Sequence, residues 1–599
     1  MRFFLLGLNR RLQVLLGLLF FVALLLPNIA YFLKLHVHLV NFFEEPVFFI
    51  WDCLDVVMLA HPFLPVVVFE LILLALVGRF GFWMLLHLPF FCWLPLELIY
   101  IHRYGVPSSA HILAIITETN YGEALGYIGG WGNLFWLLGY LVVLMIVLVM
   151  LLRSGVGWKH RSRWWLLSIS AGVLVVSTVS NQSVQASSVD KADSPNERKD
   201  IFVAKQFGYG LDEYVKSYPF GLVLRFVQYF QELNILENSA RQVASLNSGL
   251  NRDAMAENET YVVVIGESSR ADRWSINGYT RDTNPLLAKQ ANLFTFTNAI
   301  SVSAATRTAV PAILSKTSVD DLSVSRLKRS WITDFKRAGF KVYWLSTQMP
   351  VGTHDTMVGV YASLADRTLY LNEGAYQIRG VYDSVVLGEL KKIVKESKPK
   401  KKLIIIHTLG SHFPYHYRYP EDFSYFKPVP PRNETGNLFD KSQKEVLQNA
   451  YDNSVRYTDF VLSSVIDALK LEGERKSSVS AMWYLSDHGQ TLFDLGCAVS
   501  GHGFDSAYNF HIPVVFWVSD SFLSRRPHVK EAVSENREKP LYAGDFFETI
   551  LDTGGFERAK PFNSFIEDAY HASSRTVTAQ GYVKYDYDKE FAAESCEKI

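Results

Sequence analysis

Hydrophobic and polar positions divide the chain into two regions with different patterns. In the first ~180 residues, apolar runs of about the length that crosses a bilayer alternate with short polar stretches. From Thr260 onward, shorter apolar runs alternate with segments of helical periodicity. The first pattern predicts an α-helical membrane domain, and the second predicts an α/β domain with a mostly parallel central sheet.

Five apolar runs in the first region have the length and composition of membrane spans. They cover residues 12–33, 56–77, 80–101, 134–152 and 164–179. Residues 42–55 are also apolar, but the carboxylates within them favour a re-entrant or interfacial helix over a sixth span. A cleaved signal peptide is the alternative for the first run, and the lack of a small-residue cleavage site argues against it.

Positive charges predict the orientation of these spans. Arg2, Arg10 and Arg11 precede the first span, Arg79 lies between the second and third, and further basic residues lie between the fourth and fifth. All of them fall on one side of a five-span arrangement, and Lys and Arg are retained on the cytoplasmic side. We therefore expect the chain after about residue 180 to lie outside the cytoplasm.

The same patterns predict three parts: a transmembrane domain over residues 1–180, a linker with interfacial helices over 181–258, and a catalytic domain over 259–599. Within the linker, residues 187–200 are polar and irregular, whereas residues 220–236 carry apolar side chains at helical spacing. Such a helix packs either on the soluble domain or on the membrane surface. The spacing does not distinguish these two interpretations.

Five apolar runs of the third part predict central strands, and four periodic segments predict helices on both faces of the sheet. The strands are expected within residues 261–266, 341–346, 402–410, 481–487 and 512–519. The helices are expected within residues 330–339, 382–397, 445–470 and 542–555.

Composition and charge add two points. The chain carries 59 basic and 59 acidic residues and has no basic patch of the nucleic-acid type, so nucleic acid is not an expected partner. Of its four cysteines, Cys53 and Cys92 lie in the membrane region. Cys497 and Cys596 lie in the exported part, where an oxidising compartment allows a disulfide between them.

Two of the predicted strands end in metal-type ligands. Glu267 follows the run VVVIG, and Asp487 and His488 follow the run YLS. Carboxyl ends of parallel strands meet at one edge of a sheet, so these side chains are expected together there. Two carboxylates and an imidazole suit zinc and leave a position for a nucleophile. Either motif alone is also common as a cap or a structural contact.

A hydroxyl-rich segment lies between the two ligand motifs. It contains Ser301, Ser303, Thr306 and Thr308. A hydroxyl attacks phosphorus at neutral pH only when a base or a metal lowers its pKa. The alternative is a polar loop that opens a helix, with Ser303 or Thr306 as the N-cap. The two interpretations are compatible, because a helix N-terminus also binds anionic phosphate.

Several motifs together resemble one known family. The segments GESSRADRWSINGYTRDTNP, SVSAATRTAVP, HTLGSHFPYHYRYP, YDNSVRYTDFVLSSV and SDHGQTLFDLG followed by GHG are similar to those of the phosphoethanolamine transferases of Gram-negative bacteria. These are inner-membrane members of the alkaline-phosphatase and sulfatase superfamily. The resemblance implies Zn²⁺, phosphatidylethanolamine as the donor, lipopolysaccharide or a glucan as the acceptor, and a catalytic domain in the periplasm.

The resemblance also implies roles for individual residues. It places the zinc site on Glu267, Thr306, Asp487 and His488, with Thr306 as the nucleophile that forms a phosphothreonine-type intermediate. It places the phosphate-side histidines on His412 in GSHFP and His502 in GHG; His407, nearer the strand, is expected to be structural.

In the membrane region, TETNYGEALGYI resembles a loop near the donor head group. The resemblance implies that Asn120 and Glu123 meet the ethanolamine ammonium group. A solvated loop is the alternative.

The chain departs from the disulfide-rich relatives that modify lipid A. Those relatives carry a lysine in the loop that here reads TQMPVGTHD, where Gln348 or His354 could take over phosphate binding. The pattern WLSTQ and the few cysteines look more like the branch that acts on core sugars or periplasmic glucans.

Three rival functions remain. A phosphoglycerol transferase acting on a glucan or other envelope polymer would use the same ligands. A sulfatase would need a Cys/Ser-x-Pro-x-Arg signature, which does not follow Glu267. A non-catalytic envelope scaffold would have no reason to retain the complete ligand set.

Overall fold

The structure is a computed structural model of the 599-residue chain. It describes residues 10–35, 63–104, 107–108, 113, 131–158, 160–168, 214–246, 249–317, 319, 328–348, 357–372, 381–434, 436–476, 478–494, 496–503, 505–557, 560–579 and 584–591. The chain forms two compact units, and helix α12 (Phe220–Ser245) belongs to both. Residues of α12 up to Phe230 belong to the first unit, and those from Gln231 onward belong to the second.

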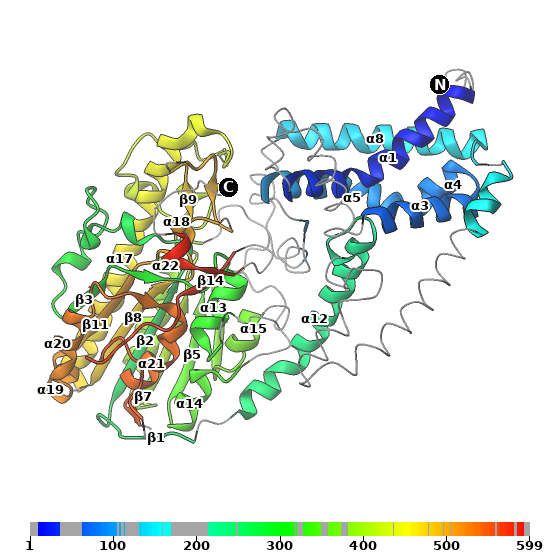
Figure 1. Ribbon diagram of the computed structural model, residues 1–599. Coiled ribbons are helices and arrows are strands. Elements are labelled where there is room, and N and C mark those ends of the chain that lie inside the picture. The colour runs from blue at the N-terminus through cyan, green and yellow to red at the C-terminus, as the bar shows by residue number, and fades with distance from the viewer. Residues whose placement is uncertain are drawn as a thin grey trace. The chain divides into compact units, whose positions relative to one another are not determined.

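The first unit is built from apolar helices (Figure 1). They are α1 (Arg10–Leu35), α3 (Phe63–Val77), α4 (Phe80–Leu86), α5 (Leu88–Tyr104) and α8 (Trp131–Ser154), joined by the first turns of α12. Within the described residues, α1 and α8 are each long and apolar enough to cross a membrane. Helices α4 and α5 make one further candidate, bent by 65° between them, and α3 is a shorter apolar helix.

The five-span arrangement stays a prediction. The fifth expected span is described only as far as residue 168, and residues 42–55 lie outside the described residues. The helices that are described pack through a core that includes Leu24, Trp83, Phe91 and Leu148. This confirms an apolar helical domain at the N-terminal end of the chain.

The second unit is an α/β domain around a seven-stranded sheet with the order β3-β11-β8-β2-β7-β5-β6. All neighbouring strands pair in parallel except β11, which is antiparallel to β8 and β3. The strands are β2 (Glu259–Gly266), β3 (Leu293–Phe296), β5 (Lys341–Ser346), β6 (Arg367–Tyr370), β7 (Lys401–His407), β8 (Val479–Ser486) and β11 (Val514–Val518). The mostly parallel sheet and its five predicted strands are thus confirmed.

Shorter elements complete this unit. Four two-stranded pairs are β1 (Asn251–Arg252) with β13 (Phe556–Glu557), β4 (Ala299–Ile300) with β12 (Leu541–Tyr542), β9 (Thr491–Leu492) with β10 (Ser500–Gly501), and β14 (Thr576–Thr578) with β15 (Lys584–Asp586). The helices are α13 (Thr306–Leu314), α14 (Trp331–Arg337), α15 (Met357–Ala362), α16 (Val386–Lys395), α17 (Lys444–Lys476), α18 (Ala507–Phe510), α19 (Asp520–Arg525), α20 (His528–Glu535), α21 (Phe546–Thr553) and α22 (Tyr587–Glu590).

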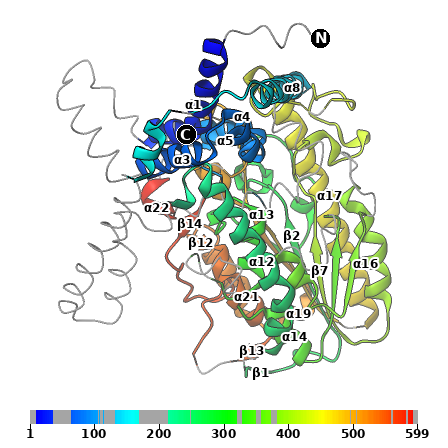
Figure 2. The same ribbon diagram turned by 90° about the vertical axis from the view of Figure 1, so that its right-hand side faces the viewer.

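Helices cover both faces of the sheet because its central strands are apolar on both faces. On β2, Tyr261, Val263 and Ile265 face a core shared with α13, α14 and α21. Val262 and Val264 face a second core shared with α16 and α17. Figure 2 shows these two groups of helices on opposite sides of the sheet. This arrangement leaves the carboxyl edge of the sheet to be finished by loops.

Candidate active site

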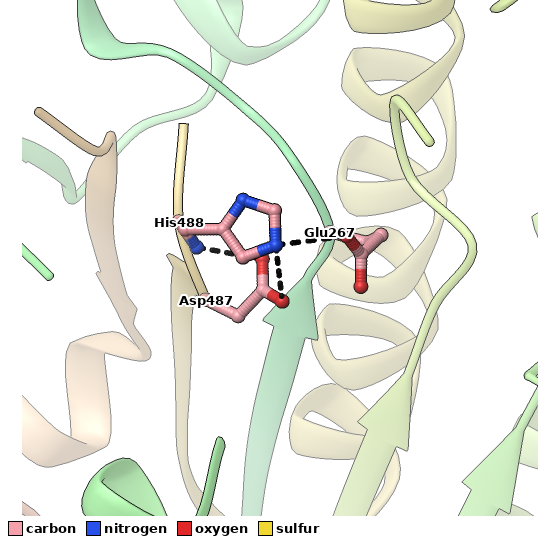
Figure 3. Close-up of side chains that lie close together, drawn as sticks. All are labelled: Glu267, Asp487 and His488. Carbon is pink, nitrogen blue, oxygen red and sulfur yellow. Dashed lines mark hydrogen bonds and ion pairs between the residues drawn. The ribbon is translucent and has the colours of Figure 1, made fainter. Parts of the chain in front are cut away.

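The two ligand motifs meet at the carboxyl edge of neighbouring strands. Glu267 directly follows β2, and Asp487 and His488 directly follow β8 (Figure 3). The strands are parallel and paired in register as far as Gly266 and Ser486, so the next residues emerge side by side. One ligand atom from each of the three side chains lies within 4.8 Å of the others, and all three side chains are buried. The structure therefore brings together the group that the sequence predicted.

The imidazole of His488 is oriented by a backbone contact. Its Nδ1 donates to the carbonyl oxygen of Gly489 at 2.8 Å, which leaves Nε2 unprotonated. Nε2 lies 3.4 Å from a carboxylate oxygen of Glu267 and 3.4 Å from one of Asp487. A lone pair therefore faces the two carboxylates, as a metal ligand requires.

Asp487 is held by one oxygen only. Its Oδ1 accepts from the backbone N–H groups of Ser268 at 3.0 Å and His488 at 2.6 Å. Its Oδ2 is buried and has no hydrogen-bond partner among the described residues. A buried polar atom without a partner is costly, so an ion at this position would satisfy it.

Burial shifts the protonation of the group. Burial, followed by the neighbouring Asp487 carboxylate, raises the pKa of Glu267 well above its ordinary value. Burial lowers the pKa of His488, against the opposing effect of Asp487. The carboxylates of Glu267 and Asp487 are both buried and place oxygen atoms within 4.8 Å of each other. Two such negative groups repel each other, and a cation between them would remove that repulsion. The donor set of two carboxylates and one imidazole fits a divalent ion such as zinc.

Thr306 is the first residue of α13, and its hydroxyl points at this group. Its Oγ1 donates to Oε2 of Glu267 at 3.0 Å and lies 3.2 Å from Nε2 of His488. The alternative interpretation of this segment, with Ser303 or Thr306 as the N-cap, is wrong, because the N-cap is Ala305 and no side chain caps it. The reason is that both hydroxyls are engaged elsewhere.

The other three hydroxyls of the segment make different contacts. The hydroxyls of Ser303 and Thr308 are hydrogen-bonded to each other at 2.6 Å. Ser301 donates to the backbone carbonyl oxygens of Ser303, at 2.9 Å, and Asp487. Of the four candidates, Thr306 alone places its hydroxyl against the side chains of Glu267 and His488.

The structure also places the two predicted phosphate-side histidines beside this group. The ring of His502 lies 4.4 Å from that of His488 and 5.8 Å from that of His412, between centroids. Burial, followed by the neighbouring histidines, lowers the pKa of His502 well below its ordinary value. His407 is the last residue of β7 and is buried edge-on against Trp344, which suits a structural role.

Gln348 comes to the site from the end of β5. Its Nε2 donates to Oε2 of Glu267 at 3.3 Å and to the carbonyl oxygen of Thr408 at 2.9 Å. Its rival for phosphate binding, His354, lies outside the described residues. Asn120 and Glu123, the expected contacts of the donor head group, also lie outside them.

Sequence reasoning missed the residues that contact the backbone of Glu267. Gly410 adopts a φ of +50°, and a Cβ there would lie 2.6 Å from the carbonyl oxygen of Glu267. Ser411 donates its backbone N–H to the same oxygen at 2.9 Å. The glycine in HTLGSHFP was the one available signal, since a glycine after a strand can mark a close backbone approach.

Asp383 binds the backbone of the loop that contains Gly410, and sequence reasoning did not identify it either. It is buried at the start of the segment leading to α16 and accepts from the backbone N–H groups of Leu409 and Gly410, both at 2.9 Å. It also accepts from the hydroxyl of Thr347 at 2.5 Å. Asp383 therefore ties the ends of β5 and β7 together. In the sequence it read as an ordinary first-turn residue of a helix.

The structure describes one of the two cysteines that we expected to form a disulfide. Cys497 is disulfide-bonded, as a residue in an oxidising compartment can be. Cys596, which we expected as its partner, lies outside the described residues, as does Cys53. Cys92 is free.

The fold and the site define the class of this protein. Residues 259–556, which make up most of the α/β domain, match the sulfatase family. The structure of the full-length lipooligosaccharide phosphoethanolamine transferase A of Neisseria meningitidis has the same fold, with a TM-score of 0.59 and 19% identity over 94% of this chain and 99% of the other.

Sequence relatives narrow the class. The chain is 26% identical to phosphoethanolamine transferase EptC of Escherichia coli strain RS218 over 80% of this chain and 81% of the relative. It is 30% identical to phosphoethanolamine transferase EptA of Salmonella typhimurium, over 49% and 53% of the two chains. The Zn complex of the periplasmic domain of E. coli EptC aligns with a TM-score of 0.51 and 25% identity, over 58% of this chain and 98% of that domain. The chain is thus a homologue of the phosphoethanolamine transferases, as its motifs predicted, while its branch among them stays a prediction.

Proposed function

We propose that the chain transfers phosphoethanolamine from phosphatidylethanolamine to an envelope acceptor of the lipopolysaccharide or glucan type. The observation that carries the proposal is the position of Thr306, whose Oγ1 lies 3.0 Å from Glu267 and 3.2 Å from His488. The relatives named as phosphoethanolamine transferases support this choice of group. Transfer to an envelope glycolipid fits a membrane domain joined to an exported catalytic domain.

Glu267, Asp487, His488 and Thr306 are the residues that would hold a metal ion. The unpartnered Oδ2 of Asp487 and the unprotonated Nε2 of His488 support this assignment. Zinc, as in the EptC complex, would lower the pKa of the Thr306 hydroxyl and stabilise negative charge on the phosphoryl oxygens.

The chain's own groups account for the remaining steps. Thr306 gives up its proton towards Oε2 of Glu267, the atom to which it already donates a hydrogen bond. Its oxygen then forms a bond to phosphorus while the bond from phosphorus to the diacylglycerol oxygen breaks, and the proton passes to that oxygen, which leaves phosphoethanolamine on Thr306. In the second step the oxygen of an acceptor hydroxyl forms a bond to the same phosphorus while the bond from phosphorus to Oγ1 of Thr306 breaks, and the proton of the acceptor hydroxyl returns to Thr306. His412 and His502, whose rings lie 5.8 Å apart beside this group, are the residues that we assign to the phosphate side of the site.

Mass spectrometry of the envelope tests the proposal. Lipid A, core oligosaccharide and periplasmic glucan are compared between cells that contain the chain, cells that lack it, and cells with Thr306→Ala. We expect phosphoethanolamine on one of these acceptors only when Thr306 is present. Glycerol phosphate in its place would show a phosphoglycerol transferase. Equal modification in all three cell types would contradict the proposal.

A further inference from the structure

Helix α12 changes character along its length. Its first eleven residues, 220–230, contain one charged side chain, Arg225, whereas residues 231–245 contain Glu232, Glu237 and Arg241. The division between the two compact units falls at the same point, after Phe230. The early turns of α12 therefore belong with the apolar helices in both composition and packing.

One side of residues 218–230 contacts helices α1 and α5 of the first unit at two positions, Tyr218 and Arg225. Below its first turn, the hydroxyl of Tyr218 donates to the carbonyl oxygen of Phe90 in α5. Tyr218 also exchanges two backbone hydrogen bonds with the amide side chain of Asn28 in α1, at 2.7 and 2.8 Å. Higher up, Arg225 binds Glu97 of α5 at 2.7 Å.

These contacts give the register between the two helices. Tyr218 meets Phe90 and Arg225 meets Glu97, and the separation along the chain is 128 residues in both cases. The segment therefore rises beside α5 in the same direction and at the same rate. Continued, this register places Phe230 level with His102, next to the end of α5 at Tyr104. The apolar run of α5 ends there with His102 and Arg103.

The single charge of the segment is fully enclosed. Arg225 and Glu97 are each 1% exposed. Arg225 also donates to the carbonyl oxygen of Ser108 at 2.5 Å and to that of Gly221 at 3.0 Å, and Glu97 accepts from Ser108 and Trp93. A charged side chain within a bilayer must be paired and hydrogen-bonded. Arg225 meets both requirements.

The opposite side of the segment is apolar and uncovered. Val223, Val227 and Phe230 are 46%, 47% and 57% exposed, and their spacing of four and three residues puts them on one face. Leu222, on the packed side, is 3% exposed. The membrane helices of the same unit carry similar exposed apolar residues, such as Leu76 in α3 and Val142 in α8. The apolar face of α12 is thus exposed to a similar degree as apolar side chains of these helices.

We propose that residues 220–230 of α12 lie in the outer half of the bilayer, with Val223, Val227 and Phe230 against lipid, and that α12 leaves the membrane at Phe230. Eleven helical residues rise about 16 Å, roughly half of the ~30 Å hydrocarbon core. The positive-inside orientation puts the end of α5 at the outer surface. The proposal does not depend on the transfer reaction.

Spin-label accessibility of the full chain in vesicles of phosphatidylethanolamine and phosphatidylglycerol tests the proposal. Nitroxides are attached to Val227→Cys and Phe230→Cys, with Arg241→Cys on the same helix as the exposed control. The chain without an introduced cysteine gives the background. Oxygen, which concentrates in lipid, and a water-soluble nickel chelate report the surroundings of each label.

We expect the labels at positions 227 and 230 to be accessible to oxygen and at least about tenfold less accessible to the nickel chelate than the label at position 241. Equal nickel accessibility at all three positions would place the segment in water and overturn the proposal. Low accessibility to both reagents at positions 227 and 230 would show a protein partner on this face and would overturn it as well. Transfer activity of each variant is measured separately, so a failed transfer reaction leaves this test intact.

Discussion

The hydroxyl oxygen of Thr306 lies 3.0 Å from Oε2 of Glu267, although the two residues are 39 positions apart. One is the first residue after a central strand, and the other is the first residue of a helix. The contact selects one hydroxyl among four in the same segment. The Thr308 hydroxyl, two residues away, is turned instead towards Ser303.

Replacing Thr306 with Ala should therefore abolish transfer, while replacing Thr308 should not. We expect Thr306→Ala to lower the transfer rate by about 10³-fold or more, because none of the other three hydroxyls of the segment lies against the side chains of Glu267 and His488. Thr308→Ala removes the hydrogen bonds of that hydroxyl to Ser303 and to the carbonyl oxygen of Ala305, neither of which involves Glu267 or His488, and it serves as the matched control. The rate of transfer of labelled phosphoethanolamine from vesicles measures both. A Thr308→Ala variant that is as inactive as Thr306→Ala would contradict the assignment.

Zinc binding should depend more on the carboxylates of Glu267 and Asp487 than on the hydroxyl of Thr306. Asp487→Asn is expected to lower zinc affinity by at least about 100-fold, because it removes a negative ligand from a buried site. Thr306→Ala should still bind zinc, since Glu267, Asp487 and His488 remain. Elemental analysis after dialysis against a range of free zinc concentrations measures the affinity. Full loss of zinc from Thr306→Ala would show that the hydroxyl is indispensable to the site.

Asp383 should be needed for both stability and activity. In Asp383→Asn one carboxylate oxygen becomes an N–H group that faces the backbone N–H of Leu409 or Gly410, which costs about 1–3 kcal/mol. The loop that supports Glu267 is then released, so the transfer rate should fall as well. Glu389→Gln in α16, which disturbs the ion pairs with Lys392 and Arg367, both partly exposed, is the control and should change stability little. Thermal unfolding and transfer rates measured together decide the outcome.

The buried pair of Glu97 and Arg225 should be sensitive to the loss of either partner. Glu97→Gln leaves the guanidinium enclosed without its counter-charge, and such a loss typically costs about 3–5 kcal/mol. Replacing both residues, as Glu97→Gln with Arg225→Met, should cost less than the sum of the single changes. Unfolding in detergent by a double-mutant cycle measures the coupling. Strictly additive effects would show that the two side chains do not interact.

His407 should make the catalytic domain sensitive to acid. Burial lowers the pKa of His407 from 6.5 to about 4, so the folded state keeps this ring neutral where the unfolded chain is already protonated. The free energy of unfolding should therefore fall as the pH drops from 6.5 to about 4, by about 3 kcal/mol from this group. His407→Phe keeps the buried ring and should make the fall shallower. Unfolding of the two proteins across this pH range gives the comparison, and identical slopes would exclude His407 as the cause.

The parts of the fold that depend on apolar patterning could be predicted from the sequence. Runs such as YVVVIG and AMWYLSD are buried on both faces, and only a central strand accommodates this. The ligands Glu267, Asp487 and His488 follow those runs directly, so predicting the strands also predicted their meeting. The choice of Thr306 needed the resemblance to a known family, because spacing alone left four hydroxyls.

The supporting residues could not be predicted, since they act through the backbone. Asp383 binds the N–H groups of Leu409 and Gly410, and nothing in the side-chain pattern marks such a contact. The sequence pattern was also misleading about the N-cap of α13, where a hydroxyl was the expected capping group. A free hydroxyl next to a helix start usually caps it, but here Ser303 and Thr306 are bound by other groups. The pairing of Glu97 with Arg225 joins positions 128 residues apart and likewise leaves no local trace.

Glu267 follows the middle strand of the sheet, which has β8 on one side and β7 on the other. A strand paired on both sides belongs to the most stable part of a domain, so Glu267 and Asp487 are held where local opening is least favourable. Loops at the rim have no such constraint and can change length or sequence at little cost. Substitutions in those loops can therefore alter which molecule reaches the site while the ligands at the strand ends keep their positions.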